Sequence, residues 1–291
     1  MITEMLFPEN EYIIPAYYGR QCRSFWRMAE LAGISVRFIP TGKHPQVYEG
    51  RGGPHHFSVV LDGTQIIIDF SDIWETGLMK FDPDLLYFRY MYYNDARYRT
   101  VPNLYPLGMF LDIHDGTYEE FFELCKKSSY SAADGIICCN QHPYANALTR
   151  RTFVQKMLKE RYGDQVNTQF EEGRQRSFWE RAQKSFLSVV VPGACNSMVD
   201  RGHVEQFALG ICTVAPPLET MFTYFEQPKD GIHYIQCKPD YSDLCEKINW
   251  CYVHKDECVR IGKNAAELFQ RCYLPTNYFK WIEQVIKETS L

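Results

Sequence analysis

The stretch at residues 188–216, SVVVPGACNSMVDRGHVEQFALGICTVAP, places two short apolar runs on either side of a helical pattern. Residues 188–191 have the composition of a buried strand, and Pro192-Gly193 marks a turn after it. The apolar spacing then predicts a helix over 199–209 and a second strand over 211–215. A strand, a helix and a strand in this order predict a parallel sheet with a right-handed crossover.

The same alternation extends through the rest of the chain. Towards the C-terminus it predicts strands at 135–139, 166–170, 187–191, 211–215 and 232–236, with helices at 143–161, 177–186, 199–209, 241–253, 255–272 and 277–288. Towards the N-terminus it predicts a short apolar segment at 12–15, a helix ending at Gly33, a strand at 36–39 and a hairpin of 57–61 with 65–70 around Asp62-Gly63. A polar break near 128–133 predicts two α/β domains, residues 1–130 and 131–291.

The composition excludes several classes of protein. Lys plus Arg number 31 against 36 Asp plus Glu, so the net charge of −5 offers no basic field for a nucleic-acid backbone. The longest apolar runs are far shorter than the roughly 20 residues that span a bilayer. The first residues lack a basic segment followed by an apolar core, so no secretory signal is expected. We therefore expect a cytoplasmic protein.

The cysteines and the aromatic residues both favour packing roles. The eleven cysteines are scattered, odd in number and without a CxxC pair. Reduced, mostly buried thiols are therefore expected, with no structural metal. Aromatic residues make up 15% of the chain and cluster at 87–93. Rings form good platforms for sugars and bases, but core packing is the more common role.

An anion site is expected where the helix at 199–209 begins. Arg201 and Glu205 lie one turn apart on the same face of that helix. The backbone N–H groups, the positive end of the helix dipole and a guanidinium would together suit a diphosphate. The carboxylate could accept hydrogen bonds from a ribose. The alternative is an ordinary surface pair of the kind that contributes little to stability.

The order of these motifs resembles a known enzyme family. The pattern Arg-x-x-x-Glu-x-x-Ala-x-Gly at 201–210 is followed by HYIQCK at 233–238, DYSDLCEKINW at 240–250 and VRIGKNAAELF at 259–269. Residues 134–291 thereby resemble the donor-binding half of GT-B-fold glycosyltransferases. The branch most similar contains the capsule-associated and protein O-glucosyltransferase-like enzymes, together with group 1-like glycosyltransferases. The resemblance implies two Rossmann-like domains that face a cleft, with the C-terminal helices packing back on the N-terminal domain.

The resemblance also implies roles for individual residues. Residues 140–151, NQHPYANALTRR, are similar to the loop and arginine that follow the first strand of the donor domain. The diphosphate would then be held by Arg201, Asn196, Ser197 and either Arg150 or Arg151. The ribose and base would be held by Glu205, Tyr234 and Ile235, with His203 either beside them or structural. GT-B enzymes commonly stabilise the leaving group without a metal, so no metal or cofactor is expected beyond the donor.

The first half matches the family more weakly. Asp69 and Asp72, in IDFSD at 68–72, are similar to the element that carries a catalytic aspartate in inverting relatives. Inverting transfer needs one general base beside the acceptor hydroxyl. Asp72 is the expected base and Asp69 its partner or substitute, while His55 and His56 are competing candidates. Both aspartates could instead be ordinary turn or cap residues.

Asp82-Pro-Asp84 superficially resembles the metal-binding Asp-x-Asp motif of the other glycosyltransferase architecture. We interpret it instead as a helix N-cap. Signatures of hydrolases, P-loop proteins and ordinary dinucleotide-binding proteins are missing from the sequence.

The expected function is transfer of a sugar from a nucleoside-diphosphate sugar to an acceptor hydroxyl, inverting and metal-independent. The expected partners are the nucleotide sugar and an acceptor glycan, lipid-linked glycan or other hydroxyl compound. One alternative is a non-catalytic protein that binds a nucleotide sugar or glycan. Another is a phage-type glycosyltransferase acting on modified DNA bases, with a local basic face that includes Arg23, Arg27 and Lys43.

Overall fold

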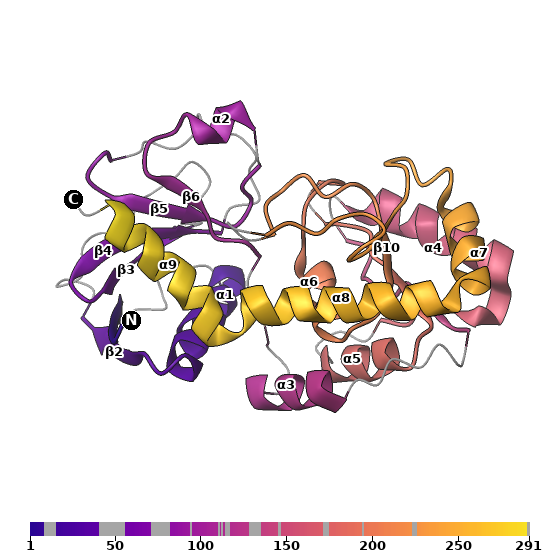
Figure 1. Ribbon diagram of the computed structural model, residues 1–291, viewed down its shortest axis with the longest axis horizontal. Helices are drawn as coiled ribbons and strands as arrows, with labels where there is room; N and C mark the ends of the chain where they lie inside the picture. Colours follow the sequence, from indigo (N-terminus) through magenta and orange to yellow (C-terminus); the bar gives the residue numbers. More distant parts are fainter. Residues whose placement is uncertain are drawn as a thin grey trace. The chain divides into compact units, whose positions relative to one another are not determined.

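The computed structural model describes residues 1–8, 16–40, 56–70, 82–93, 95–109, 111, 113, 117–127, 135–144, 147–170, 175–193, 195–222 and 226–289 (Figure 1). The chain divides into two compact units. Unit 1 comprises Met1–Asp112, Thr220–Phe225 and Cys272–Leu291, and unit 2 comprises Ile113–Glu219 and Glu226–Arg271. Unit 2 thus begins before the predicted boundary at residues 130 and 131, and the chain returns to unit 1 at its C-terminal end.

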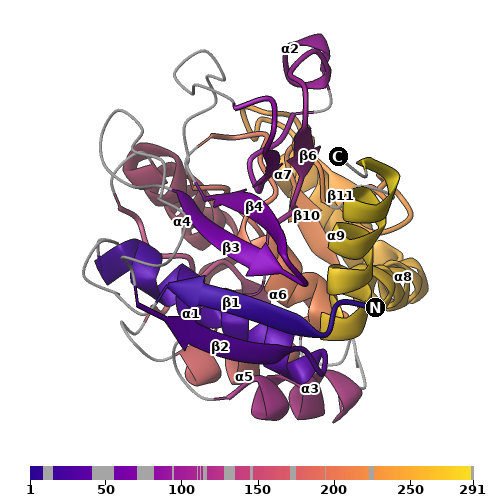
Figure 2. The ribbon, with the colours of Figure 1, turned by 90° about the vertical axis from the view of Figure 1, so that its left-hand side faces the viewer.

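Unit 1 is built on a mixed six-stranded sheet. Its elements are β1 (Glu4–Pro8), α1 (Ala16–Leu31), β2 (Ser35–Ile39), β3 (His56–Leu61), β4 (Thr64–Asp69), β5 (Leu86–Arg89), α2 (Ala96–Arg99), β6 (Leu104–Pro106) and α9 (Pro275–Thr289). The strand order is β2-β1-β3-β4-β5-β6, and Figure 2 shows β2, β1, β3 and β4 side by side. β3 is antiparallel to both β1 and β4, whereas the other neighbouring pairs are parallel.

The hairpin of β3 and β4 follows from its turn residues, as predicted. Asp62 and Gly63 have φ angles of 45° and 88°. Asp and Gly tolerate this region, which a two-residue hairpin turn of matching twist requires. The Asp62 carboxylate also accepts hydrogen bonds from the backbone N–H groups of Thr3 and Glu4. The turn therefore also holds the start of β1, a strand that is not predicted from the sequence. The apolar segment predicted at 12–15 lies outside the described residues.

The aromatic run at 87–93 belongs to the core of unit 1. Residues 87–92 are all buried, and Tyr87 and Tyr92 pack in one cluster with Ile67 and Tyr98. The expected helix N-cap before this run is wrong, because the segment forms strand β5. Asp82 instead accepts a hydrogen bond from the backbone N–H of Asp84, 3.0 Å away, in the turn before β5. Pairing with β4 and β6 outweighs the local cap pattern.

The last helix packs on the first one. The rings of Phe279 in α9 and Phe25 in α1 lie 5.4 Å apart. The indole N–H of Trp281 donates to the carbonyl of Pro106 at the end of β6, 2.9 Å away. The expected return of the C-terminal helices to the N-terminal part of the chain is therefore confirmed for α9. Among the described helices, none is long and apolar enough to cross a bilayer.

Unit 2 is built on a parallel sheet. Its elements are α3 (Tyr118–Lys127), β7 (Ile137–Cys138), α4 (Leu148–Tyr162), the 3-10 helix η5 (Gly163–Gln165), β8 (Val166–Asn167), α5 (Gln175–Gln183), β9 (Leu187–Val189), α6 (Arg201–Ala208), β10 (Thr213–Ala215), β11 (Ile235–Gln236), α7 (Leu244–Val253) and α8 (Lys255–Tyr273). The strand order is β11-β10-β9-β7-β8, and every neighbouring pair is parallel. The predicted parallel sheet is confirmed, although each strand is shorter than predicted.

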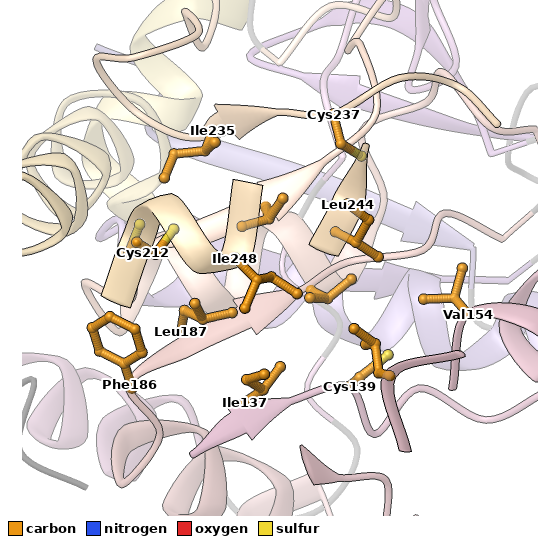
Figure 3. Packing of buried hydrophobic residues seen from close by; sticks show 14 of the residues in the cluster. Ile137, Cys139, Val154, Phe186, Leu187, Cys212, Ile235, Cys237, Leu244 and Ile248 are labelled. Carbon is orange, nitrogen blue, oxygen red and sulfur yellow. The ribbon is translucent and has the colours of Figure 1, made fainter. Parts of the chain in front are cut away.

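The core of unit 2 fills the space between this sheet and the helices that follow its strands. Ile137, Leu187, Ile235, Leu244 and Ile248 all belong to it, and Figure 3 shows them packed around the strands. The Val-Ile-Leu-rich strands are buried as expected for a parallel sheet that is covered on both faces.

Gly262 gives a stability test of this packing. It lies in α8, where Gly→Ala ordinarily adds roughly 0.5–1 kcal/mol of stability. A β-carbon at Gly262 would overlap the backbone carbonyl oxygen of Gly210. We therefore expect Gly262→Ala to destabilise the protein by about 2 kcal/mol in urea unfolding. The neighbouring exposed position supplies the control, since Lys263→Ala should change stability by no more than about 0.5 kcal/mol. A stabilised Gly262→Ala variant would contradict this packing.

Candidate functional site

The predicted diphosphate residues lie at one edge of the unit 2 sheet. Because all strand pairs there are parallel, the carboxyl ends of β7, β9 and β11 meet at the same edge. Open α/β sheets bind ligands outside the carboxyl ends of their strands. The loop after β9 leads into α6, and the N-cap residue of α6 bonds back to that loop: the Gly193 N–H donates to Asp200 Oδ2 at 3.2 Å.

Arg151, in the first turn of α4, is buried and ties three segments together. Its Nε donates to the carbonyl of Val191 in the loop after β9 (2.9 Å), and its Nη1 donates to the carbonyl of His142 in the loop after β7 (2.8 Å). Its Nη2 lies 3.4 Å from Asp200 Oδ2 at the start of α6. The guanidinium also lies over the ring of Tyr144. Arg151 therefore acts as an internal anchor of the site.

Arg150 holds the same loop from its other side. Its Nη2 donates to the carbonyls of Pro192 and Gly193, at 3.1 and 2.7 Å. Its side chain is half-buried, and within the described part of the chain its buried Nε has no hydrogen-bond partner. Of the two arginines that the sequence offers for a diphosphate, Arg150 is thus the less buried and the less fully bonded.

Asp200 caps α6 and fixes the direction of its N-terminus. The backbone N–H of His203 donates to Asp200 Oδ1, and the backbone N–H of Asp200 donates to His203 Nδ1 at 3.1 Å. This is a reciprocal capping box in which a histidine takes the place of the usual Glu or Gln. His203 is completely buried, and its Nε2 has no partner among the described residues. Its contacts are those of a helix cap.

The charge of Asp200 is stabilised inside the protein. Burial alone would raise the pKa of its carboxyl group, but the hydrogen bond from the backbone N–H of His203 and the nearby charge of Arg151 hold that pKa below its usual value. A carboxylate that remains ionised can both cap the helix and pair with Arg151.

Arg201 places a positive charge at the N-terminus of α6. Its side chain is 38% exposed, and its Nε lies 3.7 Å from Oε1 of Glu205, one turn further on. The Glu205 side chain is only 2% exposed. Its Oε1 also accepts a hydrogen bond from the side-chain amide of Gln175, at the start of α5. This arrangement differs from a surface pair, because the carboxylate that orients Arg201 is itself buried.

The loop before α6 is held by the segments that follow β10 and β11. Asn196 Nδ2 donates to the carbonyl of Pro239, and Asn196 Oδ1 accepts from the Tyr241 hydroxyl, both at 2.6 Å. The carbonyl of Ser197 accepts from the backbone N–H of Glu219 at 2.7 Å. The predicted diphosphate residues Asn196 and Ser197 therefore lie in a loop that is tied down at both ends.

Tyr234 and Ile235, predicted to face the donor base, lie at the start of β11. Tyr234 is buried and its hydroxyl donates to Gln236 Oε1 at 3.0 Å. Burial raises the pKa of Tyr234 to about 12, so its hydroxyl stays protonated at neutral pH. Ile235 is buried in the core of unit 2.

The predicted catalytic residues of the first half are only partly described. Asp69 ends β4 in unit 1 and is fully buried, with its Oδ2 3.5 Å from Nε of the equally buried Arg89. The two residues are opposite one another in the parallel pair β4–β5. Asp72 and His55 lie outside the described residues, as does the side chain of His56.

Three residues at this edge are absent from the sequence-based prediction: Asp200, Gln141 and Gln175. Asp200 could have been found, because an Asp immediately before a helical pattern is a common N-cap. Gln141 lies in the quoted 140–151 motif, and its Oε1 accepts from the backbone N–H of Val191 at 2.7 Å. Gln175 carries no local signal, because the fold alone brings it to Glu205.

The solved structures similar to this chain include two sugar-related proteins. Anabaena Alr3699/HepE, crystallised in complex with UDP and glucose, superposes with a TM-score of 0.50 and 11% identity over 100% of both chains. The chain shares the HepE fold. A glycosyltransferase from Rickettsia africae ESF-5 gives a TM-score of 0.45 and 13% identity over 69% of this chain and 63% of that one. The shared fold is a mixed α/β architecture with two parallel-rich sheets.

The sequence by itself identifies no family for the chain, because no protein-family model matches it. An uncharacterized protein, 179R of Invertebrate iridescent virus 6, is 28% identical over 130 residues, which are 40% of this chain and 10% of that protein. The matched region thus spans about a tenth of the length of this curated relative.

The Asp200–Arg151 pair predicts a pH-dependent stability. Because the folded pKa of Asp200 is depressed, its stabilising contribution is present above the unfolded pKa of about 3.9 and is lost as pH falls through the folded pKa. Asp200→Asn keeps a capping side chain but loses the charge. We expect the variant to be roughly 3 kcal/mol less stable at pH 7, with the difference shrinking below about pH 4. Urea midpoints measured across this pH range provide the test.

Asp256→Asn is the matched control for Asp200→Asn. Asp256 lies in the first turn of α8 and is exposed. Its loss should cost at most about 1 kcal/mol. If the two variants had equal stability at neutral pH, the buried pair would not contribute as described.

Proposed function

We propose that the protein is a glycosyltransferase of the GT-B type that transfers a sugar from a nucleoside-diphosphate sugar to an acceptor hydroxyl. The observation that carries this proposal is Arg201: a partly exposed guanidinium in the first turn of α6, at the carboxyl edge of a parallel sheet, oriented by the buried Glu205. The shared fold with HepE, whose crystals hold UDP and glucose, supports a nucleotide sugar as the ligand class.

The donor diphosphate would lie between the loop at 192–197 and the start of α6. Backbone N–H groups at a helix N-terminus and a guanidinium both favour a diphosphate. In this proposal Arg201 and Arg150 contact the phosphates, whereas Arg151 positions the loop because its donors are occupied by carbonyls and Asp200. Asn196 and Ser197 would offer further donors from the tethered loop.

The ribose and base would lie deeper, towards α5 and β11. Glu205 is the proposed ribose contact. Its carboxylate would accept a hydrogen bond from a ribose hydroxyl, either in place of the bond from the Gln175 amide or in addition to it. His203 would support this position through the helix cap. Tyr234 and Ile235 would contribute to the base side of the donor site.

The proposed reaction is an inverting displacement with Asp72 as general base. The base takes the proton of the acceptor hydroxyl, and the acceptor oxygen forms a bond to the anomeric carbon. The bond from that carbon to the diphosphate oxygen breaks, and the diphosphate leaves with the electron pair. Arg201 and Arg150 would stabilise the negative charge that develops on the diphosphate. In this proposal the two arginines do so without a metal ion.

Arg201→Ala tests the donor site. We expect the wild type to show a rise in melting temperature with UDP, GDP, dTDP or CMP sugars in a thermal-shift panel. The UDP series is expected to give the largest shift. Loss of the guanidinium should weaken binding of the responding nucleotide roughly 10- to 100-fold, in line with the value of a charge-assisted hydrogen bond. Isothermal titration calorimetry would measure the change.

Arg260→Ala is the control, because Arg260 is also a helix arginine paired to a glutamate within one turn and is 48% exposed. It should bind nucleotide as the wild type does. Equal affinity of wild type and Arg201→Ala for the responding nucleotide would overturn the placement of the diphosphate.

Asp72→Asn tests the base. We expect unchanged donor affinity and a fall in kcat of roughly 100- to 10,000-fold in a sugar-transfer or donor-hydrolysis assay. Asp69→Asn serves as the comparison: it removes the charge that faces the buried Arg89, so its main expected effect is a lower melting temperature. Full turnover by Asp72→Asn would rule out this aspartate. A wild-type protein that binds the nucleotide sugar and never turns it over would instead be a binding protein.

A further inference from the structure

Three cysteines from separate elements meet in the core of unit 2. Cys212 lies immediately before β10, Cys251 lies in α7 and Cys258 lies in α8. Their sulfur atoms all lie within 4.8 Å of one another, and each side chain is completely buried. The Cys258 thiol also lies 3.7 Å from the carbonyl oxygen of Cys251.

Other buried cysteines of the same core do not join this group. Cys139 and Cys237 belong to the same hydrophobic cluster. Figure 3 shows Cys212 at the end of that cluster nearest Phe186, with Cys139 and Cys237 at the opposite end. A single buried cysteine is ordinary core packing. The convergence of three sulfurs from the start of β10, from α7 and from α8 calls for a different explanation.

The spacing of the sulfurs suits a metal bound by thiolates. Zinc–sulfur bonds of about 2.3 Å place the sulfurs of a shared ion about 4 Å apart. Thiolates select soft or borderline ions such as Zn²⁺ over the oxygen-loving Mg²⁺ and Ca²⁺. The observed sulfur separations, up to 4.8 Å, exceed that spacing by no more than about 1 Å. Binding would release the thiol protons to solvent, because thiolates are the ligand form.

We propose that Cys212, Cys251 and Cys258 form a structural binding site for a thiophilic metal ion of the zinc class. The ion would join the start of β10 to the two helices that cover that part of the sheet. No structural metal is expected from the sequence because its cysteines form no CxxC pair, whereas this group combines Cys251 and Cys258 with the distant Cys212, immediately before β10.

The proposed metal site is separate from the donor site. Cys212 precedes β10, so it lies at the amino ends of the parallel strands, whereas Arg201 and the loop after β9 lie at their carboxyl ends. The ion would therefore contribute to folding and stability, not to the reaction. A failure of nucleotide binding would leave this proposal unaffected.

Zinc content is the direct test. The full chain is purified under a thiol reductant, incubated with Zn²⁺ and freed of excess metal by gel filtration, and its bound metal is measured by native mass spectrometry. We expect about one Zn²⁺ per chain in the wild type and in the control Cys139→Ala, and loss of that ion in Cys258→Ala. A chelator should lower the melting temperature of the wild type by roughly 5 °C or more.

Cobalt substitution keeps the test valid if Cys258→Ala folds poorly. Wild-type protein loaded with Co²⁺ should develop the intense near-ultraviolet absorption of thiolate-to-cobalt charge transfer, and one equivalent of Zn²⁺ should abolish it. Three outcomes would overturn the proposal: no bound Zn²⁺ and no such absorption, equal zinc content in Cys258→Ala and wild type, or a disulfide between two of the three cysteines in freshly purified reduced protein.

Discussion

The buried pair of Arg151 and Asp200 is the interaction on which the candidate site depends. The contacts of Arg151 connect four segments: the first turn of α4, the loop after β7, the loop after β9 and the N-terminus of α6. Two charges out of water are costly unless they are paired and hydrogen-bonded, and removing one partner leaves the other uncompensated. The same pair therefore couples the positions of these loops, and loss of either partner would disturb all of them.

The three arginines at this edge of the sheet make different contacts. The N–H groups of Arg151 donate to backbone carbonyl oxygens, and the Asp200 carboxylate balances its charge inside the protein. Arg150 holds the Pro192-Gly193 turn and is half-buried, while the side chain of Arg201 is 38% exposed and is oriented by Glu205. A chain with a net charge of −5 can bind an anionic donor if a few such cations are fixed in place, because binding depends on the local field and not on the total charge.

The sequence predicted those features that local patterns determine. The Asp62-Gly63 hairpin, the parallel pairing of the unit 2 strands and the helix at 255–273 all follow from turn chemistry or apolar spacing. Strands β1 and β5 were missed because pairing with distant strands decides them. Likewise, no local pattern announces that Asp69 faces Arg89 or that Gln175 reaches Glu205. The motif residues were placed at one edge of the sheet, but which arginine is an anchor and which is exposed depends on tertiary contacts.

A crystal structure of the protein with UDP would show where the diphosphate binds. We expect electron density for the diphosphate at the first turn of α6, within hydrogen-bond distance of the Arg201 guanidinium and of backbone N–H groups in the loop before it. Arg151 should keep its contacts to Val191, His142 and Asp200. Density for the nucleotide at any other place on the protein, or none at a saturating concentration, would contradict this placement.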